Sequence, residues 1–272
     1  GIISKYQKSR KKINEGVFYL ARKIAIVNQK GGVGKSTTAI NLGASIAERG
    51  REVLIVDVDP QGNATSGMGL EKSDLEYSIY DALINDTDLN DIIQPTGHHN
   101  FYILPANIDL AGAEIELVSV MSRESRLKKK IEESDIEYDY IIFDCPPSLG
   151  LLTLNALTAS DSLIVPIQCE YYALEGLGQL MQTIELVQSN LNPDLTLLGV
   201  VLTMNDARTN LSSQVIEEVK KYFGKDVFDT IIPRNVRLSE APSFGEPIIT
   251  YDSSSRGAHA YKELAKEVIA RE

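Results

Sequence analysis

The sequence predicts a doubly wound α/β fold, in which a mostly parallel, twisted sheet has helices on both faces. The first observation is a series of short apolar runs rich in β-branched residues, separated by segments with helical spacing. The second is that these runs are continuous rather than alternating, which is typical of parallel strands buried on both sides. The expected strands are residues 24–27, 53–56, 140–143, 163–167, 195–202 and 227–232, and the clearest helices are 173–188, 212–223 and 258–269.

Composition indicates a soluble globular protein, with 272 residues of which 43% are hydrophobic and 24% charged. No run approaches 18 apolar residues, so no membrane-spanning helix is expected. The two cysteines, Cys145 and Cys169, lie in apolar runs and suit a reducing cytoplasm. Residues 66–135 are less regular, and we expect them to form a helical insertion on one side of a single domain.

Charge divides the chain into two parts. Residues 1–23 contain seven Lys or Arg against one acid, a net charge of +6, whereas the whole chain carries −11, which leaves −17 for the rest. We therefore predict a basic, disordered extension at 1–22, with a basic anchor for DNA or a partner as the alternative. A single domain should then occupy 23–272. We also hypothesise that Leu20 marks the native start, with residues 1–19 an upstream extension.

A glycine-rich segment after the first expected strand predicts a phosphate-binding loop. Glycines allow backbone N–H groups to turn toward phosphate oxygens, and the following helix N-terminus adds partial positive charge. Lys35 is placed to reach the β- and γ-phosphates, and the Ser36 hydroxyl to ligate Mg²⁺. The loop is a variant, because Gln29 replaces its usual first glycine and a second lysine, Lys30, stands at its entrance. The segment reads Lys30-Gly31-Gly32-Val33-Gly34-Lys35-Ser36-Thr37-Thr38.

Acidic residues follow two other expected strands. Asp57 and Asp59 come after the second strand, and Asp144 ends the strand at 140–143. Ligands of such sheets gather outside the carboxyl ends of the strands, so these carboxylates should face the phosphate loop. An apolar strand ending in Asp is the usual second half of a nucleotide site, where it holds Mg²⁺ directly or through water.

Together these motifs resemble the ParA/MinD group of ATPases, which have a deviant Walker A phosphate loop. Further segments are similar to the small chromosomal ParA proteins called Soj, and the resemblance covers residues 22 to 270. It implies a P-loop NTPase fold, ATP and Mg²⁺ as cofactors, and ATP hydrolysis with low intrinsic turnover. The similar segments begin at Lys30, Asp57, Leu110, Asp144, Cys169, Asp206 and Pro233.

The resemblance assigns roles to individual residues. Lys30 is expected to reach the ATP of the opposite subunit in a sandwich dimer, with Gly31 at the dimer contact. Asp59 would position or activate the attacking water, and Asp57 would hold water in the Mg²⁺ shell. The metal ligands would be Ser36 and Asp144, and the catalytic residues Lys30, Lys35 and Asp59. ATP would contact Lys30, Gly31, Gly32, Val33, Gly34, Lys35, Ser36 and Thr37, with adenine near Asn205 and Pro233.

DNA contacts are expected from a few arginines, because the acidic body would repel DNA elsewhere. Arg208 and Arg237 stand where the Soj-like relatives carry non-specific DNA-binding arginines, and the planar guanidinium suits phosphate. Arg234, Arg256, Lys220, Lys221 and Lys225 would enlarge the patch. No segment resembles a base-reading helix, so contact with the backbone of double-stranded DNA, independent of sequence, is the expectation.

The implied function is ATP-dependent partitioning of a chromosome or plasmid. ATP-bound homodimers would coat the nucleoid in the cytoplasm until a ParB-type centromere-binding protein stimulates hydrolysis and release. The resemblance leaves open a contact with the replication initiator DnaA.

Three other functions stay open at this point. The first is a MinD-like membrane-cycling ATPase, although the C-terminal segment has only a modest apolar stripe and we expect no membrane contact. The second is a reductase like the nitrogenase iron protein, which needs a different placement of its two cysteines. The third is a DNA-coating protein without enzymatic activity.

Overall fold

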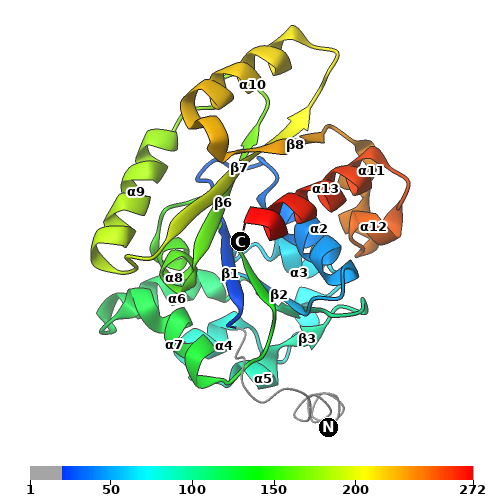
Figure 1. Ribbon diagram of the computed structural model, residues 1–272. Coiled ribbons are helices and arrows are strands. Elements are labelled where there is room, and N and C mark those ends of the chain that lie inside the picture. Colours follow the sequence, from blue (N-terminus) through cyan, green and yellow to red (C-terminus); the bar gives the residue numbers. More distant parts are fainter. Residues whose placement is uncertain (1–19, 272) are drawn as a thin grey trace.

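An eight-stranded sheet forms the centre of the computed structural model, which describes residues 20–271 (Figure 1). The strand order is β3-β4-β2-β5-β1-β6-β7-β8, and only the short β3 is antiparallel to its neighbour. The predicted doubly wound, mostly parallel sheet is therefore confirmed. The strands are β1 (Arg22–Ile26), β2 (Val53–Asp57), β3 (Gln94–Pro95), β4 (Phe101–Leu104), β5 (Tyr140–Asp144), β6 (Ser162–Gln168), β7 (Thr196–Asn205) and β8 (Val227–Pro233).

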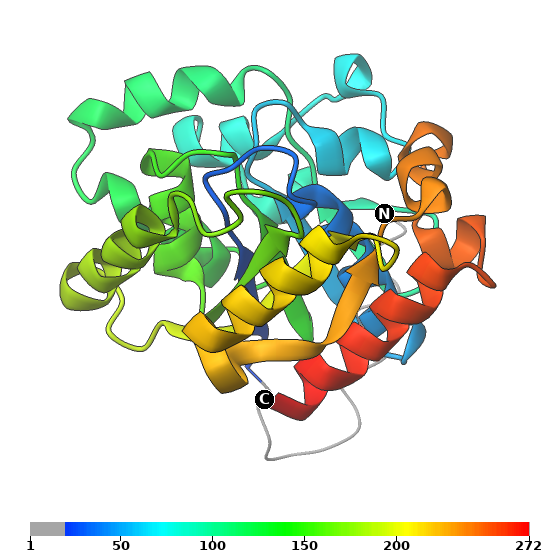
Figure 2. The ribbon, with the colours of Figure 1, turned by 90° about the horizontal axis from the view of Figure 1, so that it is seen from above.

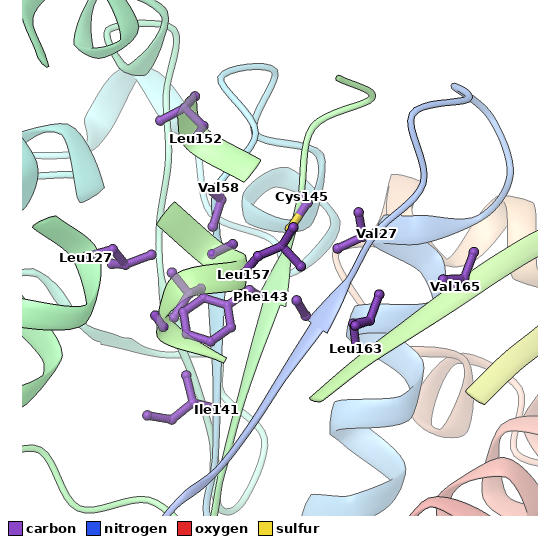
Figure 3. Packing of buried hydrophobic residues seen from close by; sticks show 14 of the residues in the cluster. Val27, Val58, Leu127, Ile141, Phe143, Cys145, Leu152, Leu157, Leu163 and Val165 are labelled. Atoms are coloured by element: carbon purple, nitrogen blue, oxygen red, sulfur yellow. The ribbon is translucent and has the colours of Figure 1, made fainter. Parts of the chain in front are cut away.

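Successive side chains of each central strand enter opposite cores, because strand side chains alternate between the two faces. In β1, Ile24 and Ile26 pack on one face, and Ala25, together with Val27 just after the strand, belongs to the core on the other. Figure 3 shows the second core, where Phe143 of β5 packs near Leu157. Both faces are therefore covered, which explains the continuous apolar runs.

Each core is closed by its own set of helices (Figure 1). The face of Ile24 is covered by α2 (Lys35–Glu48), α3 (Asn63–Gly67), α11 (Val236–Glu240), α12 (Ile248–Tyr251) and α13 (Arg256–Arg271). The opposite face is covered by α4 (Ile79–Ile84), α5 (Leu89–Ile92), α6 (Leu110–Glu116), α7 (Arg126–Glu133), α8 (Leu151–Ala159), α9 (Leu177–Asn190) and α10 (Asn210–Phe223). Short 3₁₀ turns connect several of these elements.

The prediction that 66–135 forms a helical insertion on one side was wrong, because this region also supplies two strands of the sheet. This region contributes β4, which pairs in parallel with β2, and β3, which pairs antiparallel with β4. Its helices α4, α6 and α7 pack on the sheet and bury residues such as Ile79, Leu110 and Leu127 in the second core, the one shown in Figure 3. The region is thus an integral part of the sheet.

The N-terminal boundary differs by one residue from the expected one. Arg22 pairs with Tyr140 at the start of β1, so Arg22 belongs to the sheet although we placed the boundary after it. Of the rest of the expected extension, Leu20 is exposed and Ala21 packs against the core, whereas residues 1–19 lie outside the described residues.

The C-terminal helix α13 packs against the core of its own domain. Tyr261, Leu264 and Val268 are buried against α2 and β8, and the Tyr261 hydroxyl shares a 3.1 Å hydrogen bond with Thr38 Oγ1. The Glu267 carboxylate also accepts the N–H groups of Asp229 and Thr230 in β8, at 2.8 and 2.6 Å. The apolar face of α13 is therefore already occupied.

Candidate nucleotide site

The sheet register brings three sequence motifs together at the carboxyl ends of the central strands. Asp144 at the end of β5 is the register partner of Ile26 in β1 on one side and of Asp57 in β2 on the other. The loop that follows β1 therefore lies beside both acidic strand ends. Seen from above, this loop (blue) lies over the middle of the sheet with other strand-end loops around it (Figure 2). The predicted convergence is present.

The loop geometry depends on glycine. Gly34 has a φ of +91° and Gly32 of +73°, conformations that residues with a Cβ adopt only at a cost. Gly34 is the N-cap of α2, so the N–H groups of the first turn of this helix point into the loop. Val33 is buried and its carbonyl accepts a 2.8 Å hydrogen bond from Thr203 Oγ1 of β7. This bond ties the loop to β7.

Lys35 spans the loop from inside. Its side chain is buried, and Nζ donates a 2.7 Å hydrogen bond to the Lys30 carbonyl. Burial lowers the pKa of this ammonium group, while the nearby carboxylates of Asp144 and Asp59 oppose that shift. A phosphate group in the loop would supply the negative partner that the buried ammonium needs.

Asp144 and Ser36 form the centre of the candidate metal site. The Ser36 hydroxyl donates a 2.6 Å hydrogen bond to Asp144 Oδ2, whereas Asp144 Oδ1 is buried and has no hydrogen-bond partner among the described residues. Burial, followed by the charge of Asp57, raises the pKa of Asp144 well above its usual range. Mg²⁺ prefers oxygen ligands. A hydroxyl next to a carboxylate oxygen that accepts no hydrogen bond therefore fits the predicted ion.

Asp57 and Asp59 are held by a network around the start of α3. Asp57 Oδ2 accepts the Thr65 N–H at 2.9 Å and the Thr65 hydroxyl at 2.7 Å, and Oδ1 accepts the Asp59 N–H at 3.2 Å. Asp59 Oδ1 accepts the Gln61 N–H at 2.9 Å, which orients its carboxylate. Burial raises the pKa of Asp57 to about 6. Both residues lie where the sequence predicted them, and their roles stay predictions.

Lys30 and Gly31 lie at the outer rim of the loop. Lys30 Nζ forms a 2.7 Å ion pair with Glu170 of the same chain, which follows β6, and both side chains are about one-third exposed. Gly31 is exposed, and a Cβ built on it would meet only Pro147 Cβ, at 3.9 Å. Among residues 20–271 of one chain, therefore, no contact at this position requires glycine.

The two residues predicted to lie near adenine are neighbours across the sheet. Asn205 ends β7 and Pro233 ends β8, and the two are register partners. Asn205 Oδ1 is buried and has no hydrogen-bond partner within residues 20–271. An orphaned buried carbonyl next to the phosphate loop fits the exocyclic amine of a purine.

The two predicted DNA arginines follow these same strand ends. Arg208 lies in the loop between β7 and α10, and Arg237 lies on α11 after β8. Both are exposed, at 88% and 55% of the side chain, and both already contact carboxylates of their own chain. Arg256 begins α13, and a Cβ built on the next residue, Gly257, would lie 2.6 Å from the Leu238 side chain of α11, so the start of α13 lies beside α11.

Three lysines that we expected to enlarge this patch lie away from it. Lys220 and Lys221 are in the last turn of α10, and Lys225 precedes β8. Because a helix rises about 1.5 Å per residue, they lie at the far end of α10 from Arg208. They lie near the amino ends of the parallel strands, whereas Arg208 follows a carboxyl end.

Sequence reasoning missed Glu170, Thr65 and Thr203. Glu170 comes shortly after the carboxyl end of β6, so the rule that pointed to Asp57 and Asp144 also applies to it. Thr65 and Thr203 gave no signal of this kind, because their contacts depend on α3 and on the path of the loop.

The comparisons with known proteins agree with this geometry. A family model described as an AAA domain matches residues 21–197. The sporulation initiation inhibitor protein Soj of Bacillus subtilis is 66% identical over 247 residues, covering 91% of this chain and 98% of that protein. The chromosome partitioning protein ParA of Myxococcus xanthus is 56% identical over 253 residues, covering 93% and 89%. The chain belongs to the Soj/ParA family of chromosome-partitioning proteins.

Solved structures place this Soj/ParA chain among nucleotide-binding folds. A cobyrinic acid a,c-diamide synthase from Mycobacterium smegmatis with bound ADP and magnesium has a TM-score of 0.81 at 42% identity, covering 91% of this chain and 93% of that one. The septum site-determining protein MinD from Pyrococcus horikoshii, complexed with Mg-ADP, has a TM-score of 0.73 at 28% identity, covering 92% and 96%.

Proposed function

We propose that this Soj/ParA protein is an ATP-dependent switch in DNA partitioning. In this proposal two chains close face to face over two Mg·ATP molecules, and the dimer binds DNA without sequence preference. Hydrolysis, stimulated by a ParB-type partner, returns the chains to monomers and releases the DNA. The cofactors are ATP and Mg²⁺, and the site of action is the nucleoid.

The observation that supports this most strongly is the position of the two lysines. Lys35 is buried inside the loop, whereas Lys30 is on the rim next to the exposed Gly31. One lysine is thus suited to phosphates of its own chain and the other to phosphates of a facing chain. Lys30 would have to leave Glu170 to do so, and a γ-phosphate offers more negative charge than one carboxylate.

Hydrolysis in this site would use groups already held in place. Asp59, oriented by the Gln61 N–H, would accept a proton from or orient the attacking water. Lys35 and Lys30 would neutralise the charge that develops on the phosphoryl oxygens. Ser36 and Asp144 would hold Mg²⁺, with Asp57 binding a water molecule of its shell, and the bound ion would supply positive charge to the β- and γ-phosphates.

The test is an Asp59→Ala variant. General base catalysis contributes about 10²–10⁴-fold, so turnover should fall by that order while ATP binding persists. We expect the variant to elute as a dimer on size-exclusion chromatography with Mg·ATP and as a monomer without it. A Lys35→Ala control, which loses nucleotide binding, should remain a monomer under both conditions.

The proposal fails if Asp59→Ala binds Mg·ATP by calorimetry and yet stays a monomer. The MinD-like alternative is weakened by the burial of the apolar face of α13, and no helix in the part of the chain that the structure describes meets the length and hydropathy needed to cross a bilayer. ATP-dependent flotation with liposomes would restore that alternative. The reductase alternative is weakened too, because Cys145 and Cys169 are both buried and cannot share a cluster with a facing subunit.

A further inference from the structure

Both arginines predicted to bind DNA are paired with carboxylates of their own chain. The Arg208 guanidinium binds Asp206 in fork-like fashion, with Nε at 2.9 Å from Oδ1 and Nη2 at 2.8 Å from Oδ2. Arg237 Nη1 lies 3.0 Å from Glu240 Oε2, and Nε lies 3.5 Å from Asp252 Oδ2. The donors that a DNA phosphate would use are therefore already engaged.

Hydrogen bonds within the loop between β7 and α10 hold the Asp206–Arg208 pair in place. Asp206 Oδ1 also accepts the Arg208 N–H at 3.1 Å, and the Asp206 N–H donates to Ser212 Oγ at 3.3 Å. Thr209, the N-cap of α10, donates from its hydroxyl to the Asp206 carbonyl at 3.0 Å. The carboxylate is thus held opposite the guanidinium fork, and the arginine lowers the pKa of Asp206.

We infer that Asp206, together with Glu240 and Asp252 at Arg237, sets the DNA affinity of the protein by competing with phosphate for the two arginines. A phosphate must displace these carboxylates or share the arginine with them. Each arginine therefore contributes less to DNA affinity than an unpaired arginine would. Weak contacts in one copy become sufficient only when two copies present them together. This inference rests on the proposed DNA-binding role of Arg208 and Arg237, and it names the residues that make binding depend on dimerisation.

The decisive variant is Asp206→Asn. Asparagine keeps the Oδ1 acceptor for the Arg208 N–H, so the loop should keep its shape, but it replaces Oδ2 by a donor NH2 group and so removes both the charge and the acceptor of Arg208 Nη2. Exposed ion pairs of this type change equilibria by about twofold to fivefold. Because a dimer contains two copies, we expect DNA affinity in Mg·ATP to rise by roughly fourfold to 25-fold.

The experiment measures binding to a fluorescent duplex of mixed sequence by anisotropy, in Mg·ATP and at several salt concentrations. Four proteins form a cycle: wild type, Asp206→Asn, Arg208→Ala and the double variant. Asp194→Asn, an exposed acid before β7 at the opposite edge, is the control for the change in net charge. Unfolding curves of all five confirm that each variant is folded.

The inference predicts that Asp206→Asn strengthens binding only when Arg208 is present, and that Asp194→Asn has a much smaller effect. It is overturned if the gain is the same in the Arg208→Ala background or is matched by Asp194→Asn, because the cause is then net charge alone. If Arg208→Ala weakens binding and flattens the salt slope by about 1.8 while Asp206→Asn changes nothing, the DNA role stands and only the inference fails. If Arg208→Ala has no effect, the assigned DNA contact itself is wrong.

Discussion

At the scale of single residues, Gly31 shows how a position can be unconstrained in one chain and critical in two. A Cβ there would meet Pro147 Cβ at an ordinary 3.9 Å, so substitution should not disturb the monomer. If two chains meet at this rim, however, any added side chain would separate them. The monomer structure therefore allows a variant that tests only the dimer.

We expect Gly31→Val to bind Mg·ATP normally, to unfold within about 0.5 kcal/mol of the wild type, and to remain a monomer with ATP. Calorimetry, urea unfolding and size-exclusion chromatography measure the three properties. Gly34→Ala is the contrasting variant, because its φ of +91° penalises a Cβ and the loop itself should lose nucleotide binding. Normal ATP-dependent dimers of Gly31→Val would contradict the proposed contact.

Much of the nucleotide site was predictable because its residues follow strands. Lys35, Asp57, Asp59 and Asp144 each come after an apolar run, and the rule that ligands gather at strand ends places them together. The ion pairs of Lys30, Arg208 and Arg237 were not predictable. They depend on where loops bring Glu170, Asp206, Glu240 and Asp252, and loop paths have no periodic sequence signal.

At the scale of elements, six of the eight strands were predicted, and β3 and β4 were missed. β4 has only four residues, between a turn around Asn100 and Pro105, and β3 has two, one of them Pro95. Two residues give too few positions for a pattern to be recognised, and the apolar run of β4 directly follows the polar residues His98, His99 and Asn100. The same region contains short helices, so its contribution to the sheet was hidden.

Helix α13 is the element that separates the partitioning function from a membrane-cycling one. Leu264 is fully buried against the core that also contains α2. We expect Leu264→Ala to lower the free energy of unfolding by about 2–5 kcal/mol, as measured in urea. Lys266→Ala on the exposed face, where Lys266 pairs with Glu263, is the matched control and should change stability by less than about 1 kcal/mol. Equal stability of both variants would mean that α13 can leave the core.

At the scale of the whole molecule, the buried carboxylates should make stability depend on pH. The folded pKa of Asp57 is about 6, above its ordinary value of 3.8, because burial disfavours the charged form. A raised folded pKa means that its stabilising contribution is complete below pH ~4 and is lost as pH rises through about 6. The loss is on the order of 3 kcal/mol for the nucleotide-free protein, and Asp144 shifts in the same direction.

Urea unfolding between pH ~4 and pH ~7 tests this dependence. The Asp57→Asn variant should gain stability relative to wild type as pH rises, because it has no charge to bury. Asp194→Asn, whose carboxylate is exposed, should parallel the wild type. A difference between Asp57→Asn and wild type that stays constant with pH would show that Asp57 is not the titrating group.

The two borders of the sheet have a consequence for how these molecules behave when crowded. β3 ends one border after two residues, and Pro95 has no N–H to offer a neighbouring strand. At the other border, Glu267 of α13 occupies the N–H groups of Asp229 and Thr230. Strands of another copy thus find little to pair with at either side. We therefore expect that copies of the protein can reach high local density without pairing edge to edge.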